Sequence, residues 1–283
     1  ERRVELLLRG LAQWGADVVH AHLLSLADMR ALARAGYPPL VTVHNMRPGW
    51  PPELASIAAG DAALLVGCAR AVEGELRAAA VPIPLRTVWN GIHVPAALAD
   101  PQALARARAE TRRSLAIGDE DLVLLAIANV RPQKRLHLLP DIVRSTLAAV
   151  RAGDRPRPVH LLIAGDMSPR TEAGAAALRE LHAAIDRTGM HDQVRLLGSV
   201  DPVTPLLAAG DVLVSPSAHE GLSLAHLEAL AAGRPVVASG DGGTEELGQI
   251  TAALSFLPMD ASPAAHATAI LRATEQPVTS GAA

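Results

Sequence analysis

Residues 212–238 read VLVSPSAHEGLSLAHLEALAAGRPVVA. The apolar run Val212–Ser215 predicts a buried strand, Leu222–Ala231 predicts a helix, and Pro235–Ala238 predicts a second strand. A strand, a helix and a strand in close succession are typical of a parallel βαβ unit, because the chain must cross over to start the next parallel strand. This stretch therefore predicts an α/β fold built on a parallel sheet.

The same alternation continues on both sides of this stretch. Further strands are predicted at 17–21, 40–44, 62–67, 86–89, 122–128, 159–164 and 194–197. Further helices are predicted at 24–36, 52–59, 70–80, 134–149, 171–188, 202–209 and 244–247. The two series are separated by Asn90-Gly91 and a Pro- and Ala-rich stretch that ends at Gly118. We predict two doubly wound, Rossmann-like domains: a partial first domain over 1–92, a linker over 93–118, and a second domain over 119–276.

Composition excludes several classes of protein. The 26 basic and 29 acidic residues nearly balance, which argues against a nucleic-acid partner. Cys68 is the single cysteine, so the chain has no internal disulfide and no cysteine-ligated zinc site. No apolar run approaches the roughly 18 residues that span a bilayer. We predict a cytoplasmic protein, with attachment to the membrane surface as the alternative.

Doubly wound sheets bind ligands beyond the carboxyl ends of their strands. In the first half these ends carry His20, His22, His44 and Asn45. A metal site made from the three histidines is one interpretation, and ligand contacts from His22 and His44 are the favoured one. The sequence has neither a Walker loop nor a G-x-S-x-G elbow. It therefore lacks the motifs that P-loop hydrolases and serine hydrolases need for catalysis.

Lys134 is the only lysine among the 26 basic residues, and it lies with Arg131 and Arg135 where a helix is predicted to begin. The helix dipole disfavours each cation there by roughly 0.3–1 kcal/mol. A bound anion such as a diphosphate would make the cations at this position favourable. Solvated surface charge is the alternative interpretation.

Of two glutamates that follow Ser217, Glu220 precedes the predicted helix and Glu228 lies inside it. Glu228 interrupts the apolar face of that helix, which costs several kcal/mol unless the carboxylate is hydrogen-bonded. Sugar or ribose hydroxyls can donate such bonds, and an ion pair with Arg234 is the alternative. Glu220 and Gly221 place a carboxylate and an accessible backbone at the helix start, where free amides, including those near Leu222 and Ser223, can hold phosphate oxygens.

The glycine turn at Gly240-Asp241-Gly242-Gly243 follows the strand that ends at Ala238. Glu245 occupies the third glycine position of a dinucleotide fingerprint, so the turn is a weak match to that motif. Either its backbone approaches a ligand or it is a plain turn that caps a helix.

Together these residues resemble the retaining glycosyltransferases of family 4, which have the GT-B fold. The resemblance rests on DVVHAH at 17–22, VTVH at 41–44, the strand-loop-helix through Lys134, and most specifically Glu220-Gly221 with EALAAGRPVVA at 228–238. It covers roughly residues 17–247. The family usually has Arg five residues before the motif lysine, where this chain has Asn129, and Arg131 is expected to substitute.

The resemblance implies a role for each matching residue. Lys134, with Arg131 and the backbone of Gly221, Leu222 and Ser223, would hold the donor diphosphate. Glu228 would bind the ribose hydroxyls. Glu220 and His22 would act at the transferred sugar and the departing phosphate, and His44 and Asn45 would line the acceptor cleft.

The function implied is transfer of a sugar from a nucleotide sugar, with retention of anomeric configuration and without an essential metal or cofactor. The acceptor is an unidentified glycan, lipid or small molecule. The chain begins after the opening strands of the family's first domain, so a companion chain that completes it is a further expectation. A non-catalytic binding relative or partner-dependent subunit is the alternative, and an epimerase of the same fold is a third.

Overall fold

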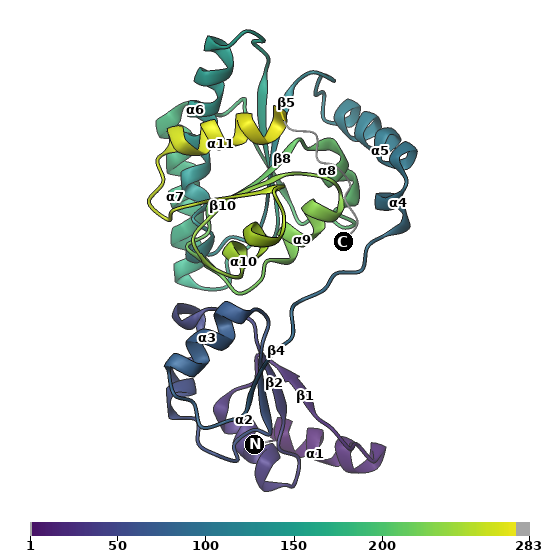
Figure 1. Ribbon diagram of the computed structural model, residues 1–283, viewed down its shortest axis with the longest axis vertical. Coiled ribbons are helices and arrows are strands. Elements are labelled where there is room, and N and C mark those ends of the chain that lie inside the picture. Colours follow the sequence, from purple (N-terminus) through teal and green to yellow (C-terminus); the bar gives the residue numbers. More distant parts are fainter. Residues whose placement is uncertain (1, 276–283) are drawn as a thin grey trace. The chain divides into compact units, whose positions relative to one another are not determined.

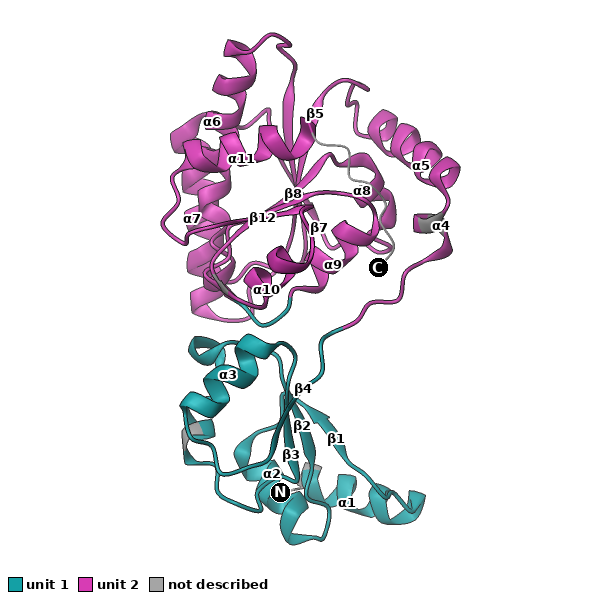
Figure 2. Cartoon of the chain, in the orientation of Figure 1, with its two compact units in different colours: residues 1–90, 220–222 teal, residues 91–219, 223–283 magenta. Residues whose placement is uncertain are grey.

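The computed structural model describes residues 2–275, and the chain divides into two compact units (Figures 1 and 2). The first unit comprises residues 1–90 with 220–222, and the second comprises residues 91–219 and 223–283. The boundaries at 92 and 118 stay predictions, because a division by contacts does not test them. Residue 276, the predicted end of the second domain, lies outside the described residues.

The first unit contains a four-stranded parallel sheet in the order β1-β2-β3-β4. Ser25 caps α2, because its hydroxyl accepts a hydrogen bond from the Asp28 amide at 3.1 Å. Leu26, Met29 and Leu32 form the buried face of that helix. The elements are α1 (Arg2–Trp14), β1 (His20–His22), α2 (Leu26–Arg34), β2 (Leu40–Val43), η1 (Arg47–Gly49), η2 (Pro52–Ser56), β3 (Leu64–Gly67), α3 (Arg70–Ala78) and β4 (Leu85–Thr87).

The second unit is built on a six-stranded parallel sheet in the order β12-β10-β8-β5-β6-β7. Its strands are β5 (Leu122–Ile127), β6 (Val159–Ala164), β7 (Val194–Gly198), β8 (Val212–Ser215), β10 (Val236–Ser239) and β12 (Leu254–Leu257), and β9 (His219–Glu220) pairs with β11 (Asp241–Gly242) outside it. Its helices are α4 (Ala96–Ala99), α5 (Pro101–Ser114), α6 (Leu139–Ala152), α7 (Glu172–Thr188), α8 (Thr204–Ala209), α9 (Leu224–Ala231), α10 (Gly243–Ile250) and α11 (Pro263–Glu275), with the 3-10 turns η3 (Pro132–Lys134) and η4 (Leu136–Leu138).

The strand order of this sheet decides where a ligand can bind. After β5 the chain adds strands toward β7 on one side, and from β8 it adds strands toward β12 on the other. The order therefore reverses between the adjacent strands β5 and β8. In open parallel sheets the crevice for a ligand forms at such a reversal, because the two following loops leave in opposite directions.

Helices cover both faces of the six-stranded sheet (Figure 1). α6, α7 and α11 lie on one face, while α8 lies on the other with α5 packed against it. The strands of the sheet are apolar along most of their length because both faces are covered. Leu122 to Ala126, for instance, are all buried.

Residues 93–118, predicted to be a linker, contain α4 and α5, and one arginine of α5 is buried against the second unit. Arg112 is only 1% exposed and forms an ion pair with Asp211 at 2.9 Å. Its guanidinium also donates to the carbonyls of Ala209, Gly118, Asp119 and Asp121. The sequence of this Arg-rich helix does not reveal the role, because the burial of an arginine depends on what packs against the helix.

Two elements near the end of the chain were missed by the sequence analysis. β12 pairs in parallel with β10, and α11 packs against α6. β12 is only four residues long, and the apolar positions of α11 are mostly alanines, so neither element has a clear periodic pattern.

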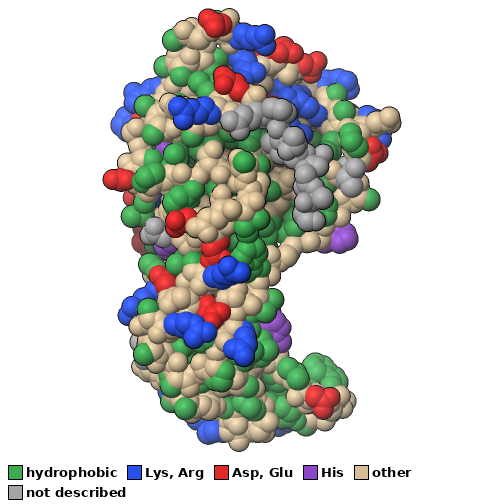
Figure 3. Space-filling model, in the orientation of Figure 1, with side chains coloured by type: hydrophobic (Ala, Val, Ile, Leu, Met, Phe, Trp, Pro, Cys, Tyr) green, Lys and Arg blue, Asp and Glu red, His purple; other side chains and the backbone are tan. Residues whose placement is uncertain are grey.

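Every helix within residues 2–275 is too short or too polar to cross a lipid bilayer. On the face shown in Figure 3, basic and acidic side chains are interspersed, in keeping with the nearly balanced charge of the sequence.

Candidate functional site

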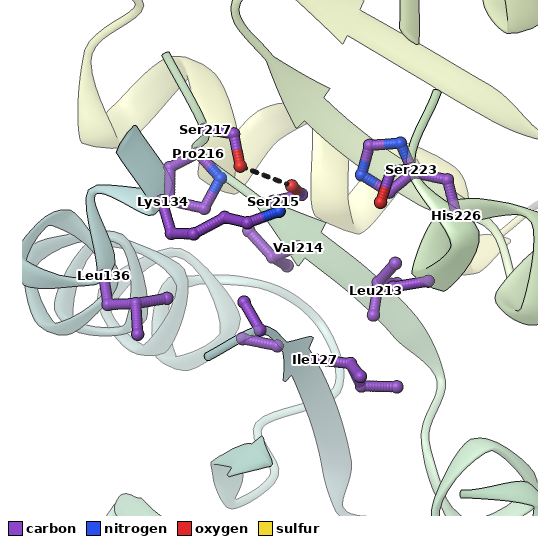
Figure 4. A pocket seen from close by; sticks show the side chains of 13 residues that line it. Ile127, Lys134, Leu136, Leu213, Val214, Ser215, Pro216, Ser217, Ser223 and His226 are labelled. Carbon is purple, nitrogen blue, oxygen red and sulfur yellow. Dashed lines mark hydrogen bonds between the residues drawn. The ribbon is translucent and has the colours of Figure 1, made fainter. Parts of the chain in front are cut away.

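A small pocket lies at the carboxyl ends of β5 and β8, where the strand order reverses (Figure 4). Lys134, Ser215, Ser217, Ser223 and His226 supply its polar lining. The Lys134 side chain extends across the pocket toward the two serines of the β8 loop, whose hydroxyls lie 3.3 Å apart. An ammonium surrounded by hydroxyl donors suits an anion such as a phosphate.

The helix predicted to begin at Lys134 begins instead at Leu139. Lys134 ends the 3-10 turn η3, and Arg135 has the left-handed backbone conformation φ 45°, ψ 41°. That conformation cannot continue a right-handed helix, so η4 and α6 start afresh beyond it. The argument that the dipole of this helix penalises the cation cluster was therefore wrong, and Lys134 is placed by a turn.

Arg135 has a structural role in the second unit. Its guanidinium donates to the carbonyl oxygens of Pro216 at 2.7 Å and Met259 at 2.9 Å, and to the Ser239 hydroxyl at 3.2 Å. Burial lowers the pKa of Arg135 from its very high ordinary value, which leaves it charged at neutral pH. Beside Lys134 in the sequence, it connects the loops after β8 and β12 to the last residue of β10.

Arg131 lies elsewhere, in a separate pocket of about 420 Å³ at the ends of β5 and β6. Asp166 and Arg170 line the same pocket. Asn129 joins the two strand ends, because its side-chain oxygen accepts the Asp166 amide at 2.8 Å. The structure therefore separates Arg131 from the lining of the Lys134 pocket, although the two residues are three apart in sequence.

Glu228 is half-buried on α9, and the alternative that it pairs with Arg234 is wrong. Arg234 donates instead to the carbonyls of Ala232 and Gly210, both at 3.2 Å. Within residues 2–275, no hydrogen bond or ion pair involves the Glu228 carboxylate. Burial raises the pKa of Glu228, which marks an ionised carboxylate whose desolvation is not offset. Glu228 is not among the residues that line the Lys134 pocket.

The segment from Glu220 to Ser223 is largely buried. Glu220 is 8% exposed in β9, and Gly221 and Leu222 are also buried. Ser223 is the N-cap residue of α9, but its hydroxyl makes no capping hydrogen bond. The Ser223 side chain lines the Lys134 pocket instead, which brings the start of α9 to the reversal point.

The glycine turn packs against the protein's own backbone. A Cβ added at Gly240 would lie 2.2 Å from the Ser217 carbonyl oxygen, so only glycine fits there. The loop after β8 is in turn bonded to the loop after β5, because the Ala218 amide donates to the Gln133 carbonyl at 2.7 Å. The close approach that was considered for a ligand at Gly240 is thus made by the β8 loop.

In the first unit, His22 and His44 form a hydrogen-bonded pair. Nδ1 of His22 lies 2.7 Å from Nε2 of His44, and the rings are stacked with centroids 5.0 Å apart. Burial lowers the pKa of His44, and repulsion by His22 and His20 lowers it further, so His44 is neutral at pH 7. His20 turns its Nε2 to the Thr42 hydroxyl at 2.8 Å.

The histidine arrangement does not form the metal site that the sequence left open. Within the described part of the chain, no group of three His, Cys, Asp or Glu side chains is placed to hold a metal ion. Asn45, the other predicted cleft residue, is half-buried, and its carbonyl accepts the Trp50 indole N–H at 2.7 Å.

His226 is the pocket residue that the sequence analysis missed. It is 1% exposed and lines the Lys134 pocket. A histidine inside the apolar run of a predicted helix was the available signal, because buried polar side chains need partners.

Comparison with known proteins gives one family. The sequence model of the family "Glycosyl transferases group 1" matches residues 121–276, more than half of the chain. The D-inositol 3-phosphate glycosyltransferase of Jonesia denitrificans is 31% identical over an alignment of 249 positions, which covers 80% of this chain and 56% of that protein. The enzyme of the same name from Salinispora arenicola is 30% identical over 82% of this chain and 50% of its own length. The chain thus spans about half the length of these curated relatives.

Solved structures agree on the fold. Anabaena Alr3699/HepE in complex with UDP-glucose matches with a TM-score of 0.76 and 20% identity, over 98% of this chain and 74% of that one. Sucrose-phosphate synthase from Thermosynechococcus elongatus matches with a TM-score of 0.73 and 20% identity, over 97% and 68%. With its two parallel sheets, the chain has the predicted α/β GT-B architecture.

Proposed function

Because this chain belongs to the group 1 glycosyltransferases, we propose that it transfers a hexosyl group from a nucleotide sugar to an acceptor, with retention of anomeric configuration. The observation that carries the proposal is the position of Lys134, the only lysine of the chain, in a hydroxyl-lined pocket at the strand-order reversal of the second unit. We place this activity in the cytoplasm.

The donor diphosphate binds at Lys134 and at the start of α9, where the amides near Leu222 and Ser223 complete the anion site. Negative charge develops on the phosphate as the sugar leaves, and a fixed ammonium stabilises that charge better than water does, because it needs no reorganisation. Glu228 accepts hydrogen bonds from the ribose hydroxyls, which would satisfy its unpaired, half-buried carboxylate. Arg131 contributes at longer range from its own pocket.

Glu220 and His22 act at the transferred sugar. The His44 side chain is neutral and hydrogen-bonded to Nδ1 of His22, so it holds that ring in one orientation and leaves Nε2 to interact with the donor. Depending on its tautomer, Nε2 of His22 can accept or donate a hydrogen bond.

A calorimetric titration with UDP, GDP and their sugars tests the donor site. Lys134→Ala is expected to weaken binding about 10–150-fold, the range for a lost hydrogen bond to a charged group of about 1.5–3 kcal/mol. Arg155→Ala, which removes an exposed cation from a loop after α6, is the matched control and is expected to bind normally. Equal affinities of the Lys134 variant and the parent chain would contradict the proposal.

The second candidate is a binding subunit that works only with a partner chain. Nucleotide-sugar binding without turnover by the full gene product, and turnover once a partner chain is added, would support this candidate.

A further inference from the structure

The first unit contains a pocket of about 310 Å³. It lies at the carboxyl ends of β1 and β2, between the start of α2 and the η1 loop, and it is lined by residues from 23–29 and 41–54. This volume is at the lower end of the range for small-molecule sites in proteins, which is about 300–1,000 Å³.

The walls of this pocket are mainly apolar. Leu24, Met29, Leu54 and Trp50 are among its hydrophobic lining residues. The Trp50 ring is fixed, because its N–H donates to the Asn45 carbonyl at 2.7 Å. A fixed indole and buried aliphatic groups form a preorganised surface for an apolar ligand, which loses little entropy in the protein on binding.

The charges around the pocket disfavour an anion. Among the residues that the structure describes, the lining includes no lysine and no arginine, and its charged side chain is Glu53. His44 also lines the pocket, and its lowered pKa leaves it neutral at pH 7. A phosphate placed here would meet a carboxylate and no cation to compensate for its desolvation.

The pocket is continuous with the histidine pair, because His44 both lines it and contacts His22 at 2.7 Å. We propose that this pocket binds the acceptor through an uncharged apolar or aromatic group, and that it orients the acceptor hydroxyl toward the histidine pair. This inference rests on the proposed function. It gives the chain a different acceptor class from the phosphorylated inositol in the names of its relatives.

Methyl NMR of methionine tests the proposal with the full chain. The sequence contains five methionines: Met29 lines the pocket, Met46 follows β2, and Met167, Met190 and Met259 lie in the second unit as internal controls. The probe is 2-naphthol, and D-myo-inositol 3-phosphate is the comparison. We expect 2-naphthol to shift the Met29 methyl and His44 imidazole signals saturably, with a Kd of about 1 mM for a ligand of this size.

A variant that fills the pocket provides the second part of the test. Leu24→Trp is expected to weaken naphthol binding at least about fivefold, because added volume in a formed pocket excludes the ligand. Ile250→Trp adds the same ring at an exposed position of the second unit and is expected to leave binding unchanged.

The outcomes separate the two proposals. An unmoved Met29 signal, equal shifts at all five methionines, or tighter binding of the inositol phosphate would overturn the apolar acceptor site. A shift at Met29 without one at His44 would show a ligand held away from the histidine pair, and would also overturn it. The donor proposal is judged separately, by nucleotide binding to the same sample and its dependence on Lys134.

Discussion

The strongest test of the donor site is Glu228→Gln, because it should change stability and binding in opposite directions. The Glu228 carboxylate is half-buried, and within the described residues it has no hydrogen-bonding or ionic partner. Leaving a buried polar group unsatisfied costs about 1–3 kcal/mol of stability. Because Glu228 is only half-buried, we expect its cost to be about 1 kcal/mol. The neutral amide is easier to desolvate, so the variant should be more stable.

The expected gain at pH 7.5 is about 2–4 °C in Tm, the usual shift for about 1 kcal/mol in a unit of 150–250 residues. The sign depends on pH. Burial raises the pKa of Glu228 in the folded protein above its unfolded value of about 4.3. The cost of ionisation is therefore greatest above the folded pKa, and it disappears as the pH falls below the unfolded pKa. The advantage of the glutamine variant should shrink in the same way toward pH 4.

Nucleotide binding should respond in the opposite sense. If ribose hydroxyls donate to the carboxylate, the loss of its charge weakens those bonds by about 1.5–3 kcal/mol, or about 10–150-fold in Kd. Thermal denaturation over pH 4–8 and calorimetry with UDP and GDP measure the two effects. Glu120→Gln, at an exposed position, is the matched control and should change neither. A Glu228→Gln variant that is less stable at pH 7.5, or that binds nucleotide as well as the parent chain, would refute the reasoning.

Three further predictions concern the framework of the site. Arg112→Ala should destabilise the chain by about 1–3 kcal/mol, because several backbone carbonyls lose a buried donor, whereas Asp211 keeps its bonds to Arg108 and to the Val123 amide. Denaturant unfolding of Arg113→Ala, an exposed neighbour, should match the parent chain. Gly165→Ala should both lower the Tm and weaken nucleotide binding, because a Cβ there would lie 2.2 Å from a carbonyl oxygen of the β5 loop. An unchanged Tm would contradict this close packing. In NMR titrations the pKa of His44 should lie below the usual range for histidine. His22→Ala should move that pKa only part of the way back to its ordinary value, because burial is the larger cause of the shift. A full return to the ordinary value would show that repulsion by His22 is the main cause instead.

Much of the fold could be predicted from the order of residue types. The apolar run Val159–Ala164 forms a strand with the predicted bounds, and the stretch that ends at Ser215 does so too. Such runs are decisive because a parallel strand covered on both faces must be apolar throughout. β12 and α11 escaped detection, since their stability comes from the packing surfaces of β10 and α6 more than from their own periodicity.

The sequence by itself also identified the residues that merit attention, because a lone lysine, a carboxylate on an apolar helix face and histidines at strand ends are unusual in composition or position. Their arrangement depended on the tertiary structure. Lys134 and Arg131 are three residues apart, yet they line different pockets, because the 3-10 turn η3 begins directly after Arg131 and ends at Lys134. Whether Glu228 pairs with Arg234, and whether His44 meets His22, depends on distances between elements remote in sequence, and only the packed sheets fix those distances.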